Sequence, residues 1–328
     1  MNMKKVLVTG AGGFIGSHLA EELARQGLRV RALVRYNGRN DWGHLEKLPK
    51  ELLRRIEVLP GDVTDPFFMD HAIAGMDTVF HLAALIAIPF SYSAPERYVA
   101  TNIQGTLNVL QACRRHKVKR MLHTSTSEVY GTARYTPIDE EHPLQGQSPY
   151  SASKIGADKI VESFYRSFGL PVTTVRPFNT FGPRQSARAV IPTMMSQLLS
   201  GNKELALGDL KPVRDFNFVR DTAEGFIALA KSPRAIGETV NLGSGRGVSI
   251  LETLRLIEKI TGSRLRVRKD ARRIRPQKSE VFKLIASNAK ARKLSDWKPR
   301  FSLEEGLRLT LDYVRTHLDE YKTNIYNL

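Results

Sequence analysis

The feature that most constrains this chain is a glycine-rich turn between a short strand and a helix near its N-terminus. The expected strand Lys5–Thr9 is followed by Gly10, Gly13 and Gly16, and the amphipathic segment Phe14–Gln26 begins within this turn. Gly10 permits a tight turn, Gly13 lets the backbone approach a phosphate, and Gly16 lets the helix pack closely on the sheet. The helix N-terminus adds positive potential. This order of elements predicts a parallel β-α-β unit that binds a dinucleotide.

The first half of the chain continues to alternate short β-branched runs with amphipathic segments. Further strands are expected at residues 29–34, 56–59, 78–82, 120–124 and 172–176, and further helices at 95–115 and 150–168. This alternation predicts an α/β fold with a Rossmann-type doubly wound parallel sheet. Beyond Arg176, shorter elements are expected at residues 191–199, 205–207, 222–230, 238–241, 250–260 and 303–316. We therefore expect an NAD(P)-binding domain over residues 1–177, with some later segments returning to it. Residues 178–328 are expected to form mainly a smaller, interwoven α/β substrate-binding cap.

The ends of the strands indicate where the dinucleotide would lie. The second strand of such folds normally ends with a carboxylate that binds the adenosine ribose, but this chain has Arg35 there. An arginine can pair with a 2′-phosphate, so it favours NADP over NAD, although a solvent-exposed surface arginine fits equally well. The residues expected to bind NAD or NADP are Gly10, Gly13, Phe14, Ile15, Gly16, Arg35, Asp62, Val63, Leu82, Ala83 and Ala84, with Tyr150 and Lys154.

Two segments carry side chains suited to acid–base chemistry. Thr126, Ser127 and Glu128 follow the fifth strand, at the sheet edge where open α/β sheets bind ligands. Tyr150 and Lys154 are four residues apart on an expected helix, so they share one face. A nearby ammonium would lower the pKa of the phenol from ~10 toward neutrality and make it a base for a sugar hydroxyl. Taken alone, the same spacing also fits a solvated helix face.

Further segments complete a pattern that covers nearly the whole chain. They are His81-Leu82-Ala83-Ala84, Arg176-Pro177-Phe178-Asn179, Arg214-Asp215-Phe216, Arg275-Pro276 and Ser302-Leu303-Glu304-Glu305-Gly306. With the glycine turn and the Tyr/Lys pair, they resemble the extended short-chain dehydrogenase/reductase family of NAD-dependent epimerases and dehydratases, whose members act on nucleotide sugars. The resemblance implies that Thr126 orients the sugar O4 together with Tyr150, and that Lys154 holds the nicotinamide ribose. It also implies that Asn179, Arg214 and Arg275 bind the nucleotide diphosphate.

Within that family, the residues after the fifth strand distinguish the reactions. Glu128 resembles the glutamate with which 4,6-dehydratases remove the C5 proton of the sugar, whereas simple 4-epimerases generally lack a carboxylate there. Those dehydratases usually have an aspartate where this chain has Ser127. Either Ser127 relays a proton through water, or Glu128 acts at both C5 and C6. The same Thr-Ser-Glu triplet also occurs in UDP-glucuronate decarboxylases.

Longer stretches favour one kind of dehydratase. They are Trp42-Gly43-His44-Leu45-Glu46, Ala84-Leu85-Ile86-Ala87-Ile88-Pro89 and the segment from Phe181 to Ala189. These stretches are similar to the nucleotide-linked N-acetylglucosamine 4,6-dehydratases of legionaminic-acid biosynthesis. We therefore expect a lyase that makes a 4-keto-6-deoxy sugar nucleotide. A 4-epimerase or a UDP-glucuronate decarboxylase of the same family is the alternative, and a non-catalytic NADP-binding module that docks on RNA is a remote one.

The net charge of +17 is concentrated in one region. Residues 262–300 contain 14 Lys and Arg against 3 Asp and Glu, and they include Arg275. A nucleotide sugar can use two or three of these charges, and the rest are expected to be a solvated surface. With the motifs in place, nucleic acid becomes an unlikely partner.

The remaining composition limits the setting of the protein. Cys113 is the only cysteine, which excludes an internal disulfide and favours a reducing cytoplasm. Apolar runs fall short of the ~20 residues that a bilayer requires, and the N-terminus does not read as a secretory signal. We expect a cytoplasmic protein without a membrane span. No His, Cys, Asp and Glu set has metal-ligand spacing, so no metal is expected. The family resemblance implies a homodimer through the helices near 95–115 and 150–168.

Overall fold

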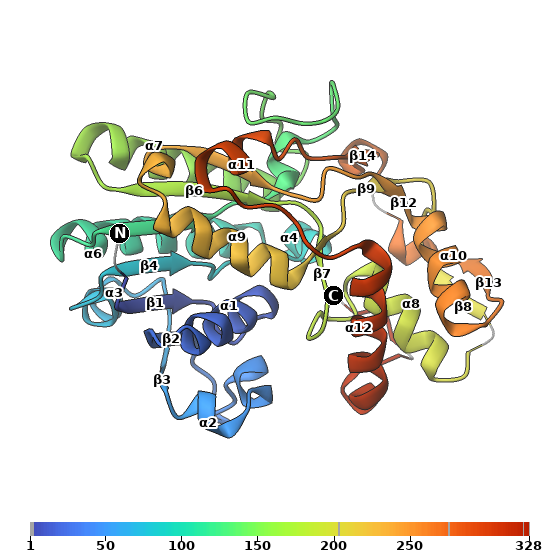
Figure 1. The fold of residues 1–328 in the computed structure, drawn as a ribbon. Helices are drawn as coiled ribbons and strands as arrows, with labels where there is room; N and C mark the ends of the chain where they lie inside the picture. The colour runs from blue at the N-terminus through green and yellow to red at the C-terminus, as the bar shows by residue number, and fades with distance from the viewer. Residues whose placement is uncertain (1–2, 203, 275, 324, 328) are drawn as a thin grey trace.

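The large unit of the protein is a seven-stranded parallel sheet (Figure 1). The computed structural model describes residues 3–202, 204–274, 276–323 and 325–327. The strands are β1 (Lys5–Thr9), β2 (Arg29–Arg35), β3 (Ile56–Gly61), β4 (Thr78–His81), β5 (Arg120–Thr124), β6 (Val172–Pro177) and β11 (Thr239–Leu242). Their order in the sheet is β11-β6-β5-β4-β1-β2-β3. The strand order therefore reverses between β1 and β4, and this reversal is where doubly wound sheets bind ligands.

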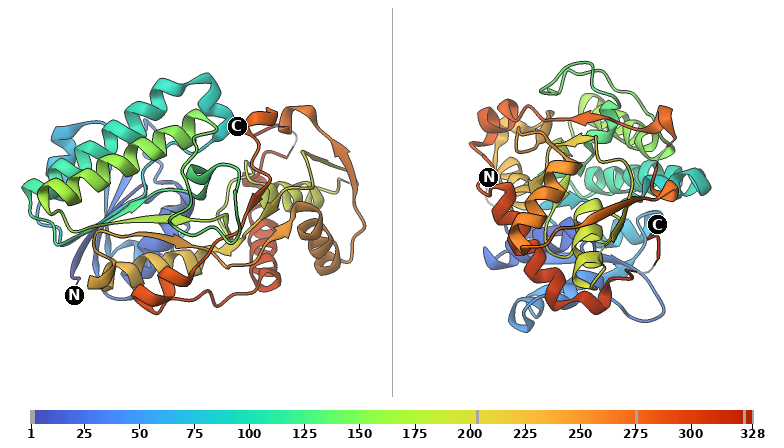
Figure 2. Two further views of the ribbon diagram at one scale, coloured as in Figure 1. Left: turned by 90° about the horizontal axis from the view of Figure 1, so that it is seen from above. Right: turned by 90° about the vertical axis from the view of Figure 1, so that its right-hand side faces the viewer.

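Helices cover both faces of this sheet (Figure 2). One face carries α1 (Phe14–Arg25), the short α2 (Lys50–Leu53), α9 (Val219–Lys231) and α11 (Ala289–Ser295), and the other carries α3 (Pro66–Ile73), α6 (Gly105–Arg115) and α7 (Pro149–Phe168). Every residue of β4 and β6 is buried. Burial on both faces is typical of a parallel sheet that helices cover on both sides.

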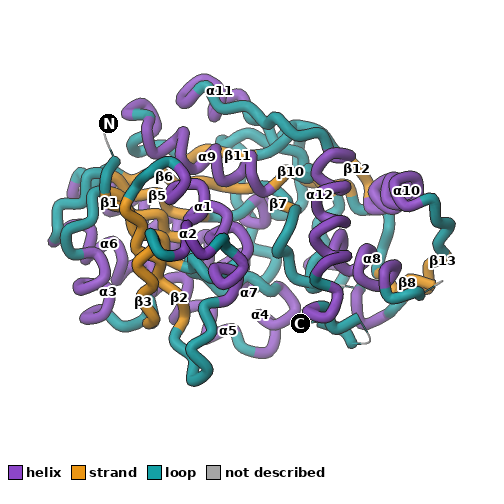
Figure 3. Tube along the Cα trace, turned by 60° about the horizontal axis from the view of Figure 1, so that its bottom comes forward, coloured by secondary structure: helices purple, strands orange, loops and turns teal. Residues whose placement is uncertain are grey.

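The smaller unit lies beyond the carboxyl ends of the strands and is built from short elements (Figure 3). Its helices are α8 (Val190–Leu199), α10 (Ile250–Thr261) and α12 (Leu303–Thr316). Its strands are β7 (Thr180–Phe181) with β10 (Asn217–Phe218), β8 (Glu204–Leu207) with β13 (Arg266–Lys269), and β9 (Val213–Arg214) between β12 (Val248–Ser249) and β14 (Lys283–Leu284). One apolar cluster, which includes Met194, Leu254 and Leu311, joins the three helices.

The expected fold class is confirmed, and most expected elements lie within a few residues of the observed ones. The expected helix over 95–115 is divided into α5 (Pro95–Tyr98), a π-helical turn η2 (Val99–Gln104) and α6; a further short helix, α4 (Ile88–Ser93), precedes it. The segment expected at 238–241 forms β11, the edge strand of the large sheet. The domain boundary at residue 177 stays a prediction.

Within the described residues, no helix is both long enough and apolar enough to cross a membrane.

Candidate active site

A cavity of about 1170 Å³ lies between the two units, at the carboxyl ends of β1 and β4. The glycine turn, the segment after β5 and the start of α7 form its wall on the side of the large sheet. Residues of the smaller unit, among them Arg214 and Arg273, line the opposite side. The cavity therefore lies at the reversal of strand order and is shared by both units.

The glycine turn fits a dinucleotide pyrophosphate. Gly10 has φ +69°, and a Cβ at Gly16 would lie 2.2 Å from the carbonyl oxygen of Gly10. The N-cap residue of α1 is Gly13, and the first turn of α1 has no side-chain cap and no acidic residue. The backbone N–H groups at this helix start can therefore bind an anion without competition from a local carboxylate. The turn has the shape and the potential that the expected cofactor requires.

Most of the other expected cofactor residues lie on the cavity wall. They are Phe14, Ile15, Arg35, Leu82, Ala83 and Ala84. The backbone N–H groups of Leu82 and Ala83 donate to Thr9 Oγ1 at 3.1 and 3.0 Å, which holds the chain after β4 close to β1. Arg35 is exposed at the rim.

Asp62 and Val63 do not line the cavity, although the sequence predicts that they bind the cofactor. The Asp62 carboxylate accepts hydrogen bonds of 2.9 Å from the backbone and the hydroxyl of Thr64. Val63 is buried against Gly105, where a Cβ on the glycine would lie 2.8 Å from Val63 Cγ2. The structure thus gives both residues local roles, and their assignment to the cofactor stays a prediction.

Thr126, Ser127 and Glu128 lie at the start of a short 3₁₀ helix, η3 (Ser127–Tyr130), shortly after β5. Thr126 is its N-cap, and its hydroxyl accepts a 3.2 Å hydrogen bond from the backbone N–H of Glu128. Ser127 is buried, whereas Thr126 and Glu128 are partly exposed, and all three residues line the cavity. The turn therefore brings a hydroxyl and a carboxylate to one wall.

Tyr150 and Lys154 reach the same cavity from the first turns of α7. Ser148 starts this helix with a capping box that Ser151 completes, and both Tyr150 and Lys154 are buried. The side chain of Tyr150 hydrogen-bonds Thr126, so the two expected catalytic segments meet directly.

The electrostatics of the pair differ from the sequence-based expectation. Burial raises the pKa of Tyr150, and the charge of Glu128 acts in the same direction against the lowering effect of the Thr126 hydrogen bond. The expectation that Lys154 brings this pKa toward neutrality is wrong for this structure. Burial also lowers the pKa of Lys154 to about 8, and the charge of Asp158 opposes that shift. The desolvation of both side chains outweighs their proximity.

The expected substrate residues have three different outcomes. Asn179 lines the cavity, and its buried Oδ1 has no hydrogen-bond partner within the described residues. Arg214 also lines the cavity and is buried, with its NH2 atom 3.1 Å from Glu280 Oε1. Arg275 lies outside the described residues. A buried amide oxygen without a partner on the cavity wall is suited to a hydrogen-bond donor on a ligand.

Sequence reasoning missed Arg184, an arginine that joins the two units. Arg184 lies in the loop after β7, is buried and has φ +69°. Its NH2 atom is 2.6 Å from Glu21 Oε2, and its NH1 atom is 3.4 Å from Ser17 Oγ, both on α1. The residue also lines the cavity. The only sequence signal was its place in the segment 181–189, which the family resemblance had singled out.

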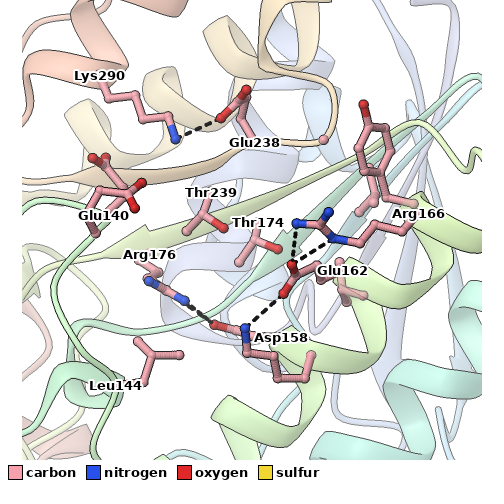
Figure 4. Close-up of a pocket in the computed structure, with 16 residues that line it drawn as sticks. Glu140, Leu144, Asp158, Glu162, Arg166, Thr174, Arg176, Glu238, Thr239 and Lys290 are labelled. Carbon is pink, nitrogen blue, oxygen red and sulfur yellow. Dashed lines mark hydrogen bonds and ion pairs between the residues drawn. The ribbon is translucent and has the colours of Figure 1, made fainter.

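A smaller cavity of about 400 Å³ lies along β6, between α7, β6 and β11 (Figure 4). Several of its charged side chains are paired: Arg176 with Asp158, Lys290 with Glu238, and Arg166 with Glu162. No group of three or more His, Cys, Asp or Glu side chains in the described part of the chain is arranged to hold a metal ion.

Comparison with known proteins identifies the family. Residues 7–310 match the sequence family described as GDP-mannose 4,6 dehydratase. The uncharacterized UDP-glucose epimerase YtcB of Bacillus subtilis is 32% identical over 314 residues, which cover 94% of this chain and 98% of that protein. A dTDP-glucose 4,6-dehydratase of an Actinoplanes species is 34% identical over 264 residues, or 79% of this chain and 82% of that protein.

A solved structure agrees with these sequence relatives. The UDP-glucuronic acid 4-epimerase from Bacillus cereus, in complex with UDP-glucuronic acid and NAD, superposes with a TM-score of 0.86. It is 28% identical, and the match covers 95% of this chain and 99% of that one. The relative holds NAD, so the NADP preference expected from Arg35 gains no support. This chain belongs to the NAD-dependent epimerase/dehydratase family, the extended short-chain dehydrogenases/reductases that modify nucleotide sugars.

Proposed function

We propose that this chain is a nucleotide-sugar 4,6-dehydratase that uses NAD. Its substrate would be a nucleotide-linked N-acetylglucosamine or a similar sugar, and its product the 4-keto-6-deoxy sugar. The observation that supports this proposal most strongly is the carboxylate of Glu128, which lines the same cavity as the hydrogen-bonded Thr126 and Tyr150 and acts electrostatically on Tyr150. A second acid–base group is what a dehydration needs beyond an epimerisation.

When bound, NAD supplies a reversible oxidation at C4 of the sugar. Tyr150 takes the proton of the C4 hydroxyl, and Thr126, hydrogen-bonded to Tyr150, orients that hydroxyl. Because burial raises the pKa of Tyr150, the phenol must lose its own proton before it can take that of the C4 hydroxyl. Lys154 would hold the nicotinamide ribose from the next turn of α7.

The second half of the reaction depends on Glu128. A ketone at C4 makes the C5 proton acidic, and Glu128 removes it. The C6 hydroxyl then leaves as water, with a proton from Glu128 or from Ser127 through a water molecule. A hydride delivered to C6 and a proton from solvent delivered to C5 would then complete the 6-deoxy product and leave the cofactor as it began. Asn179 and Arg214 would hold the nucleotide diphosphate on the other side of the cavity.

The direct test is incubation of the purified full-length protein with NAD and, separately, with UDP- and GDP-N-acetylglucosamine and UDP-glucuronate. Product masses then separate the family's reactions. Loss of one water from an N-acetylglucosamine nucleotide supports the proposal. A product of unchanged mass would instead show an epimerase, and loss of carbon dioxide from UDP-glucuronate would show a decarboxylase. Steep, salt-dependent RNA binding without any turnover would favour the non-catalytic alternative.

We further propose that the protein acts as a homodimer through the helices α6 and α7, as the family resemblance implies. Replacing NAD by NADP in the same assay tests the cofactor, because a 2′-phosphate would have to be accommodated near Arg35.

A further inference from the structure

A buried carboxylate lies behind the catalytic residues and has no part in the steps above. Asp158 belongs to α7, and only 5% of it is exposed. Its Oδ2 atom accepts a 2.8 Å hydrogen bond from Ser125 Oγ and a 3.0 Å bond from NH2 of Arg176. Its Oδ1 atom lies 3.2 Å from Nε2 of His123. A buried charge with this many donors is held in one position.

These partners come from two neighbouring strands of the large sheet. His123 belongs to β5, Ser125 immediately follows that strand, and Arg176 belongs to β6. Figure 4 shows the Arg176 side chain directed at Asp158 from across the smaller cavity. Asp158 therefore ties α7 to two strands at once.

The network reaches both catalytic segments. Tyr150, Lys154 and Asp158 occupy successive turns of α7, four residues apart. Ser125, which donates to Asp158, immediately precedes Thr126. A single carboxylate thus links the helix that carries the Tyr/Lys pair to the turn that carries the Thr/Glu pair.

Among the titratable groups around Lys154, Asp158 is the anion whose charge acts on the ammonium. His81 of β4 and His123 of β5 face the ammonium, and burial lowers the pKa of both imidazoles, that of His123 to about 4, so both are neutral at pH 7. Arg176 of β6 is cationic, and Tyr150 on α7 is protonated because burial raises its pKa.

Two more groups complete these surroundings. Tyr98 of α5 packs against the ring of Tyr150, and burial raises its pKa, so it is also protonated. Glu128 is the other carboxylate that acts on this site, from the turn after β5.

We propose that Asp158 is a positioning residue, which keeps Lys154 as an ammonium ion and fixes the turn that carries Thr126 and Glu128 relative to α7. Asp158 does not touch the substrate. The inference rests on the proposed roles of these residues, so its test includes NAD binding as well as turnover.

The substitution D158N tests the charge while keeping the shape. Burial brings the pKa of Lys154 down to about 8 even with Asp158 ionised, so NAD affinity and kcat should both fall in the wild-type protein as pH rises through this value. In D158N the ammonium loses its neighbouring anion, and both declines should move to lower pH by about 1 unit. NAD affinity is measured by calorimetry across pH, and kcat on the nucleotide sugar that the wild-type protein converts.

Two further variants separate a charge effect from a general loss of packing. S125A removes an uncharged donor from the same network. The pH at which NAD affinity and kcat decline should therefore be the same in S125A as in the wild-type protein. R176Q removes the cation that competes with Lys154 for the charge of Asp158, so NAD affinity and kcat should decline at a higher pH than in the wild-type protein. The same variant tests the proposal if D158N does not fold. A purely structural role would lower affinity equally at every pH.

The outcomes also separate this inference from the proposed reaction. If D158N and R176Q move the NAD-binding decline in opposite directions while no sugar nucleotide loses water, the inference holds and the dehydratase assignment fails. If water is lost but the declines of D158N and R176Q stay at the wild-type pH, Asp158 has no such role.

Discussion

Glu128 is the residue on which the choice among the family's reactions depends. In the proposed reaction Thr126, Tyr150 and Lys154 would serve oxidation at C4, a step that every candidate reaction shares. Glu128 lies on the same wall but one residue beyond Ser127, in a turn whose geometry is set by the Thr126 cap. In the proposed reaction its carboxylate would act on C5 rather than on O4.

The substitution E128Q should stop the reaction after the first step. The amide keeps the size of the side chain but cannot remove the C5 proton, so formation of the dehydrated product should fall by about 10²–10⁴-fold. Exchange of the C5 proton with deuterated solvent should be lost as well, while reduced-nicotinamide absorbance still appears. Mass spectrometry and absorbance follow these signals.

The exposed Glu51 of α2 supplies a matched control, because E51Q makes the same change far from the cavity wall and should leave turnover unchanged. Full turnover in E128Q would show that another group removes the proton.

At the scale of elements, the start of α1 and the start of α7 do most of the positioning. Gly16 allows α1 to approach the turn, and the capping box of Ser148 and Ser151 begins α7 so that Tyr150 and Lys154 face the cavity. The close contact at Gly16 and the capping box both depend on short segments, and each places the N-terminal end of a helix at the carboxyl edge of the sheet.

The substitution G16A should weaken NAD binding by at least about 10-fold. A Cβ at this position would lie 2.2 Å from Gly10 O and 3.0 Å from the Cα of Ala11, so the helix start must move away from the turn. The strain should also lower the free energy of unfolding by about 1–3 kcal/mol. Calorimetric titration with NAD and urea denaturation measure the two effects.

Gly38 offers the control for this change. No heavy atom lies within 4 Å of the Cβ that G38A would add, and the residue is exposed. NAD affinity and stability should stay at wild-type values in G38A; equal losses in both variants would mean that close approach of α1 is not what binding requires.

At the scale of the whole molecule, the cavity exists only because the two units are held together. Arg184 connects the loop after β7 to α1, and β11 carries the chain back into the large sheet after the first part of the smaller unit. Much of the basic region 262–300 belongs to the smaller unit, where Arg272 and Arg273 line the cavity and Arg266 and Arg268 are exposed on β13. The net charge thus has both a site-facing part and a solvent-facing part.

The proposed homodimer is tested by sedimentation equilibrium of the full-length protein. Two chains of 36.9 kDa should sediment as one species of twice that mass. Val99, Tyr165 and Phe168 lie in or beside the helices of the proposed interface and are exposed in the single chain. Sedimentation at the mass of one chain at micromolar concentration would contradict the dimer.

Local patterns were sufficient for the parallel sheet and for the glycine turn, and most of the site residues predicted from the sequence lie on the cavity wall. Strand burial, helix periodicity and turn chemistry are properties of short segments, so they can be read without knowing what packs against them. The carboxyl ends of parallel strands also meet at one edge, which is why the turn at Thr126 and the helix at Tyr150 could be assigned to a common site.

The tertiary structure alone decided what depends on distant segments coming together. Asp158 meets Ser125 and Arg176, Arg184 meets Glu21, and β11 joins β6, and no local pattern marks these contacts. The pKa values of Tyr150 and Lys154 also escaped prediction, because desolvation depends on the whole surrounding fold, whereas sequence spacing reports only that two groups are near each other.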